Sequence, residues 1–189
     1  MRKFAIEYQD LKYLISAIKP ALGKSKAQPQ HQFMKCTVNK DSLKAVAVDS
    51  YRIHTVCVPI GNESNEEFSF LLSAFSLPKA TILDCQVVDC RVSETEIEFN
   101  FGNCKHIERL GENIDGFINT EKAVPVEPPM FRYGINAKYL SEAIKSLKGD
   151  IAVLEFYGNL KPLKIHSADD DKKENDYRII MPIKIKEDE

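Results

Sequence analysis

The side chains best suited to chemistry in this sequence are five cysteines and four histidines. Zinc is bound in proteins by cysteine and histidine at short, characteristic spacings. Four such ligands follow one another in Cys85, Cys90, Cys104 and His106, but their spacing is not that of a zinc finger or ribbon, and the sequence has no Cys-x-x-Cys pair. We therefore expect reduced thiols packed as small apolar side chains, with no metal or cofactor, and keep a zinc site as the alternative.

Enzyme motifs are missing from the sequence. It has no phosphate-binding loop, no G-x-S-x-G and no H-E-x-x-H. The histidines have no cysteine or carboxylate nearby at a recognisable catalytic spacing, and His54 and His166 lie in strand patterns, where a structural histidine is the common outcome. The sequence predicts a non-enzyme. A small enzyme on an unfamiliar scaffold stays an alternative, and it would need the cysteines or histidines to meet in a cleft.

The composition sets limits on partners and location. With 189 residues, 43% of them hydrophobic, the chain is long enough to bury a core. A net charge of −2 excludes a protein that binds nucleic acid over its whole surface, so any DNA contact must be a local stripe. No apolar run approaches the roughly 20 residues of a membrane helix, and the N-terminus has no signal-peptide core. We expect a cytoplasmic protein with no membrane contact.

An internal repeat organises the chain. The segment KYLISAIK, which begins at Lys12, returns as KYLSEAIK from Lys138, and DSYRI, which ends at Ile53, returns as NDYRI ending at Ile179. Both pairs are displaced by 126 positions (12 to 138 and 53 to 179). A shared displacement indicates that the stretch between the two motifs is duplicated with its length preserved. A generic α+β domain whose two helices match by chance is the alternative.

The first copy has the pattern of a strand, a helix and three strands. The pattern predicts a strand over 4–8, a helix whose apolar residues Leu11, Leu14, Ile15 and Ile18 share one face, and Asp10 as its N-cap. Strands are predicted over 33–38, 43–48 and 51–59, the first two joined by a turn at 39–41.

Two further stretches repeat this order. The last copy predicts a strand over 131–135, a helix over 136–147, a hairpin and a final strand over 177–185. Between the copies, 67–121 has a strand, a weak helical run over 73–83 that Pro78 should shorten or break, and three strands. The fold class is therefore α+β, with three βαβββ units at 3–60, 67–121 and 131–185. We expect a complete two-unit domain at 1–121, a proline-rich connector at 122–130 and a half domain at 131–189.

Tandem units of this kind resemble the bacterial DNA sliding clamp, the beta subunit of DNA polymerase III. The run LKAVAVDSYRIHTVCVPIG at 43–61 is similar to a stretch of the clamp's second domain. Asp115-Gly116 resembles the turn that closes that domain, and YRIIMPIKI at 177–185 is similar to the clamp's C-terminus. The resemblance covers nearly the whole chain and implies the DNA-clamp fold, with antiparallel sheets and helices on one face. It also implies a shortened, divergent member, because a clamp subunit has six such units and this chain has three.

The resemblance implies a pocket for short peptides between the second domain and the C-terminal strand. By position, one wall of the family's pocket corresponds in this sequence to Val48, Ser50, Tyr51, Arg52 and Ile53. The other wall carries over to Ile179, Met181, Pro182, Ile183 and Lys184. This sequence departs from the family at Ser50, where the family has glycine, and at 117–119, where it lacks the family's proline. Ordinary strand packing is the alternative for Tyr51, Ile53, Ile179 and Ile183.

In the clamp fold, helices face DNA and contact its phosphates without reading the bases. The lysines that this resemblance assigns to double-stranded DNA are Lys12, Lys19, Lys24, Lys26, Lys138, Lys145 and Lys148. Lys12 and Lys19 are seven residues apart on one helical stripe, but a solvated helix face has the same pattern.

These observations favour a clamp-like protein of DNA replication, a processivity factor that recruits DNA polymerase or other proteins carrying a clamp-binding motif. We expect a homo-oligomer, because four chains of three units would supply the twelve units of a family ring. The alternative is an adaptor or decoy that binds clamp-interacting peptides without encircling DNA.

Overall fold

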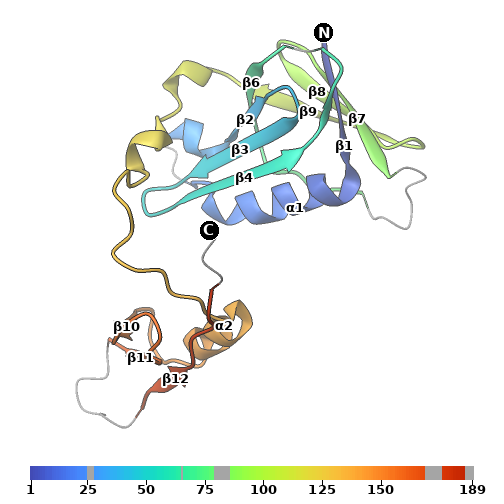
Figure 1. Cartoon of the computed structure of the whole chain (residues 1–189). Helices are drawn as coiled ribbons and strands as arrows, with labels where there is room; N and C mark the ends of the chain where they lie inside the picture. Colours follow the sequence, from blue (N-terminus) through green and yellow to red (C-terminus); the bar gives the residue numbers. More distant parts are fainter. Residues whose placement is uncertain (25–27, 65, 79–85, 169–175, 186–189) are drawn as a thin grey trace. The chain divides into compact units, whose positions relative to one another are not determined.

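The computed structural model describes residues 1–24, 28–64, 66–78, 86–168 and 176–185 (Figure 1). The chain forms two compact units, an N-terminal unit, Met1–Val124, and a C-terminal unit, Pro125–Glu189, and each is described by itself. The division falls inside the predicted connector. In the described part of the chain, neither α-helix is long and apolar enough to cross a membrane.

The first half of the N-terminal unit follows the predicted order. Strand β1 (Arg2–Glu7) leads directly into helix α1 (Tyr8–Ile18), which ends in the short 3-10 helix η1 (Lys19–Ala21) at Pro20. After η2 (Pro29–Gln32), strands β2 (Met34–Val38), β3 (Ser42–Val48) and β4 (Ile53–Pro59) form an antiparallel meander. Helix α1 begins three residues earlier than expected: Glu7 is its N-cap, and Asp10 lies in its first turn.

Helix α1 buries one face because its apolar residues recur every three or four positions. These residues are Tyr8, Leu11, Leu14, Ile15 and Ile18. The helix packs against β3 and β4. Figure 1 shows it running along one side of the meander.

A short strand, β5 (Gly61–Asn62), ends the first half. The second half contains β6 (Phe68–Leu72), β7 (Val87–Val92), β8 (Glu96–Asn100) and β9 (Lys105–Gly111). Two 3-10 helices, η4 (Ile114–Gly116) and η5 (Thr120–Ala123), close the unit. The predicted helical run is not helical over 73–78, which includes Pro78, and its remainder lies outside the described residues.

All nine strands form one antiparallel sheet in the order β4-β3-β2-β6-β9-β8-β7-β1-β5. The two halves exchange their first strands: β1 pairs with β7, with Phe4 opposite Cys90, and β6 pairs with β2, with Phe70 opposite Cys36. Each first strand also pairs with the end of its own half, β6 with β9 and β1 with β5. The exchange therefore joins both halves around one large apolar core, which includes Ile6, Leu14, Met34 and Phe99.

The C-terminal unit is a single half of this kind. Helix α2 (Ala137–Lys145) has Asn136 as its N-cap, whose side chain accepts hydrogen bonds from the amides of Lys138 and Tyr139. Strands β10 (Ala152–Phe156), β11 (Leu163–Ser167) and β12 (Arg178–Ile180) form a three-stranded antiparallel sheet.

Two strands predicted in this unit are wrong in extent. Over 131–135, only Gly134 makes a β-bridge, to Ile183, because no neighbouring strand is available to pair with the segment. The final strand stops at Ile180 rather than 185, and Pro182 follows, which has no amide hydrogen for a ladder. The core of the unit is correspondingly small and consists of Ala143, Leu163, Ile165 and Ile180.

Candidate functional site

The first predicted wall begins at a tight turn between β3 and β4. The Asp49 carboxylate accepts hydrogen bonds from the backbone amides of Tyr51 and Arg52, at 2.9 and 3.0 Å, and from the Arg52 Nε at 2.8 Å. These bonds, led by that from the Tyr51 amide, hold the pKa of Asp49 below its ordinary value, because each favours the charged form. The turn is therefore rigid at its base, and it presents the Tyr51 ring, 96% exposed, together with Ile53, 37% exposed.

Val48, which was predicted for this wall, does not line an open surface. It is 5% exposed and packs in a small cluster with Val46, Leu71 and Phe117. Phe117 belongs to the stretch in which this sequence lacks the family's proline. On the N-terminal unit the candidate wall is thus reduced to Ser50, Tyr51, Arg52 and Ile53, all of which are exposed.

The second predicted wall forms a groove in the C-terminal unit. The groove, of about 590 Å³, lies between α2 and the last strand. It is lined by predicted residues, Ile179, Met181, Pro182 and Ile183, and by residues of α2 and β12 that sequence reasoning missed, among them Asn136, Tyr139, Glu142 and Ala143. Met181 is 66% exposed there. Lys184 is exposed but does not line the groove.

From the sequence, a role was assigned to the lysines of the two KYL motifs and none to their tyrosines, so the groove residues of α2 were not predicted. Tyr139 occupies the same place in its motif as Tyr13, and both are 58% exposed. A tyrosine at the same position of both copies was the available signal.

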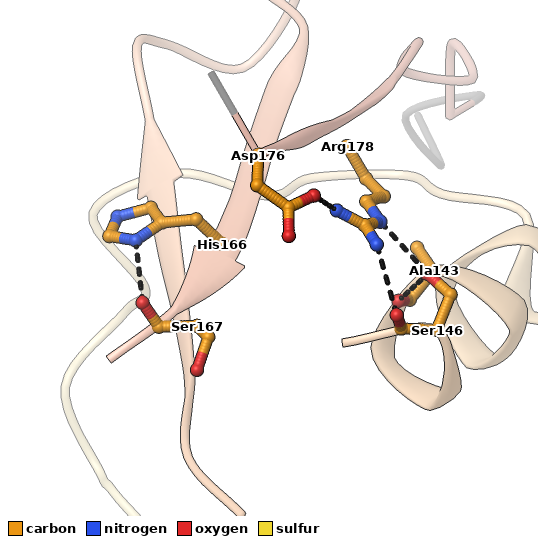
Figure 2. Close-up of polar contacts among 6 residues, drawn as sticks. All are labelled: Ala143, Ser146, His166, Ser167, Asp176 and Arg178. Carbon is orange, nitrogen blue, oxygen red and sulfur yellow. Dashed lines mark hydrogen bonds and ion pairs between the residues drawn. The ribbon is translucent and has the colours of Figure 1, made fainter. Parts of the chain in front are cut away.

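Arg178 fixes the groove wall by tying β12 to the end of α2. Its Nε donates to the Ser146 Oγ and its Nη2 to the Ser146 carbonyl oxygen, each at 2.9 Å, and its Nη1 pairs with the Asp176 carboxylate (Figure 2). The Ser146 hydroxyl in turn donates to the Ala143 carbonyl. A guanidinium at a helix C-terminus both satisfies free carbonyls and complements the helix dipole. The strand and the helix are thereby held at a fixed separation.

The predicted DNA-facing lysines are surface residues in both units. The exposed ones are Lys12, Lys19, Lys24, Lys138, Lys145 and Lys148, and Lys26 lies outside the described residues. Lys138 forms a helix-surface pair with Glu142 at 4.0 Å, which reduces the positive charge that α2 presents. Among the described residues, the ion pairs do not include Lys12 or Lys19, so the positive stripe is stronger on α1.

The cysteines and histidines that the structure describes do not gather in a cleft. Cys36 and Cys90 are buried, and no group of three potential metal ligands occurs among these residues. Cys57 is exposed, contrary to the expectation of packed thiols, and Cys85 lies outside the described residues. His54 donates from Nδ1 to the Ala17 carbonyl oxygen at 2.7 Å, which ties β4 to α1.

One histidine sits near a carboxylate and a hydroxyl, but in the wrong order for nucleophilic catalysis. His106 Nε2 lies 2.7 Å from Glu108, and the Ser73 hydroxyl donates to the other oxygen of the same carboxylate at 3.4 Å. A nucleophile must face the histidine, with the acid behind it. Here the acid lies in the middle, so the arrangement orients side chains and does not activate Ser73.

The fold and these surfaces define a class of protein. A meander whose edge receives the first strand of another half, with one helix against it, is the architecture of the DNA sliding clamps. The chain has the sliding-clamp fold.

Solved structures that resemble it are bacterial clamps. The sliding clamp from Bacillus subtilis matches with a TM-score of 0.59 at 18% identity, over 97% of this chain and 64% of that one. The DNA polymerase III beta subunit from Thermotoga maritima matches with a TM-score of 0.58 at 15% identity, over 98% and 66%. A sliding clamp from Pseudomonas aeruginosa, solved with griselimycin bound, matches with a TM-score of 0.57 at 15% identity, over 97% and 65%.

The chain thus spans about two thirds of the length of these clamps. No protein-family model matches the sequence, and no curated protein sequence matches it significantly.

Proposed function

We propose that this protein is a sliding-clamp-like, DNA-associated recruitment and processivity factor without enzymatic activity, acting in the cytoplasm. It binds short peptide motifs of DNA polymerase or of other replication and repair proteins. Double-stranded DNA is held without sequence preference against the exposed lysines, the α1 stripe of Lys12 and Lys19 contributing most.

The observation that best supports this proposal is the groove of the C-terminal unit. Its apolar lining suits one or two apolar anchors of a peptide, and the exposed carboxylate of Glu142 lies at its wall. In peptide interfaces a few buried anchors supply most of the affinity. Met181 follows the last strand and is 66% exposed, so it is available to such an anchor, whereas Ile180 is buried in the core.

The experiment is a titration, by fluorescence anisotropy, of a labelled peptide that carries a clamp-binding motif of a bacterial DNA polymerase. We expect Met181→Ala to weaken binding about tenfold, or about 1.4 kcal/mol, the scale of a strong interface contact. Met130→Ala is the matched control, since Met130 is 99% exposed and lies outside the groove. Competition with griselimycin gives a second probe, because a clamp of the same fold binds it.

Equal affinity of the unmodified chain and Met181→Ala would remove the last strand from the site. No binding to either form would reject the peptide-binding function. Tyr51→Ala tests the exposed turn of the N-terminal unit in the same assay, and an unchanged affinity would leave that turn without a role in binding.

A second candidate is an adaptor or decoy that binds clamp-interacting peptides without encircling DNA. The observation that favours it is charge, since the net charge is −2 and Lys138 is paired with Glu142, which weakens the attraction for DNA. The two candidates share the groove and differ only in how they hold DNA.

A further inference from the structure

The sheet of the C-terminal unit has an uncovered edge at β10. Among the described strands, β10 pairs with β11 alone. Its equivalents in the N-terminal unit are β2 and β7, the first strands of their meanders, and each pairs on its outer side with the first strand of the other half. The same place beside β10 is therefore vacant.

Side-chain exposure shows that the edge is incomplete. Leu154 and Phe156 lie opposite Ile165 and Leu163, so all four share the core-facing side of the sheet. Ile165 and Leu163 are 0% and 1% exposed, whereas Leu154 is 38% and Phe156 46% exposed.

The core-facing residues of the equivalent strands are at most 4% exposed; they are Met34, Cys36 and Val38 of β2, and Val88, Cys90 and Val92 of β7. The helix shows the same contrast, because Ile18 of α1 is fully buried and Ile144, its counterpart in α2, is 41% exposed. A core this small does not stabilise a unit of such length by itself.

The chain also carries the strand that such an edge accepts. In residues 131–135, Phe131, Tyr133 and Ile135 alternate with other residues, as Phe4 and Ile6 do in β1. Gly134 bridges to Ile183, near the end of its own half, just as β6 pairs with β9 and β1 with β5. What the segment lacks is the second neighbour, the meander of another half.

Apolar side chains on this segment are also incompletely buried. The rings of Phe131 and Tyr133 lie against Phe156, with centroids 6.0 and 5.3 Å apart, and Phe131 is still 46% exposed. The acceptor strand β10 and the donor segment 131–135 thus share one aromatic cluster, which the meander of another half would bury.

We propose that the C-terminal unit is completed by a second copy of this chain, residues 131–135 of each copy adding antiparallel to β10 of the other. Because one unit carries both the acceptor edge and the donor segment, two copies satisfy each other around a two-fold axis. Charge agrees with this occupant. Arg132 alternates with the aromatic residues of the donor, and Glu155 with Leu154 and Phe156, so both charges fall on the outer face of the completed sheet. The inference does not depend on peptide or DNA binding.

Sedimentation of the full chain at micromolar concentration tests the proposal. We expect assemblies with an even number of chains, beginning at twice the 21.5 kDa mass of one chain. Leu154→Lys places a charge at the proposed interface, on a side chain that the single chain already exposes, and should shift the protein to monomer. Ile107→Lys is the matched control and should leave the assembly intact, because Ile107 is an exposed aliphatic residue of β9 in the other unit.

Hydrogen exchange of the unmodified protein gives a readout that needs no variant. The β10 amides that point away from β11 should be protected in the assembly and lose that protection on dilution to monomer. A chain that stays monomeric, an assembly that survives Leu154→Lys, or β10 amides that exchange equally fast in assembly and monomer would each overturn the proposal.

Discussion

Burial divides the described cysteines into unreactive and reactive thiols. Cys36 is enclosed in the main core, and this burial raises its pKa to about 12. Burial likewise raises the pKa of Cys90 well above its ordinary value, with a smaller contribution from the charge of Asp89. Cys57 is exposed on β4. The thiolate is the reactive form, so reactivity should follow this division.

We predict that iodoacetamide at about pH 8 modifies Cys57 in the folded protein and leaves Cys36 and Cys90 unmodified. Mass spectrometry of proteolytic peptides measures the extent at each site. Unfolding in urea is the control, since it should make all three react. Labelling of Cys36 as fast as Cys57 in the folded protein would contradict the packing described for β2.

Single residues also mark where the sequence was and was not informative. The exposure of Tyr51 depends on the turn before β4, but the apolar character of the last strand could be predicted from the repeat, because alternation fixes which side chains leave the sheet. The burial of Val48 could not. It depends on Phe117, which reaches Val48 only through a long loop, and no local pattern reports such a contact.

Among the elements, the link between α2 and β12 controls the candidate groove. Arg178 donates to two oxygen atoms of Ser146 at the helix end and pairs with Asp176, so its loss leaves the Ser146 carbonyl oxygen without this donor. Hydrogen bonds to charged groups contribute more than neutral ones.

We predict that Arg178→Ala lowers the free energy of unfolding of the C-terminal unit by about 1–3 kcal/mol. Hydrogen exchange of the α2 amides measures this quantity for that unit alone. Lys161→Ala, in a turn of the same unit, should have little effect. Equal protection of α2 in the Arg178→Ala and Lys161→Ala variants would show that the link does not stabilise the groove.

The elements themselves were largely predictable where periodicity was strong. The apolar stripe of α1 and the alternation of β2, β3, β7 and β8 correspond to observed elements, while helix starts moved by a few residues. The segment 131–135 alternates as a strand should, yet it is not one in this unit, because a strand forms only where a neighbour can accept its hydrogen bonds. Periodicity reports a side chain's preferred environment and not the presence of a partner.

At the scale of the whole molecule, the manner of holding DNA separates the two candidate functions. A closed assembly retains DNA by enclosing it, whereas an adaptor binds it weakly through exposed lysines, in a manner that salt disrupts.

We predict that the protein, loaded on nicked circular DNA, stays bound in high salt and dissociates once the circle is linearised. Gel filtration of DNA with labelled protein measures retention. Lys12→Glu combined with Lys19→Glu should slow loading and leave retention on the circle intact. Equal loss from circular and linear DNA would support the adaptor.

The exchange of first strands inside the N-terminal unit also constrains how the chain is made. Strand β1 emerges from the ribosome well before its partner β7, which follows β2 to β6. Until Val92 has been synthesised, β1 can pair only with the two-residue strand β5, and non-local pairing of this kind is slow. Nascent chains should therefore pass through a long interval in which they are vulnerable to aggregation, and their yield should depend on chaperones and on the speed of translation.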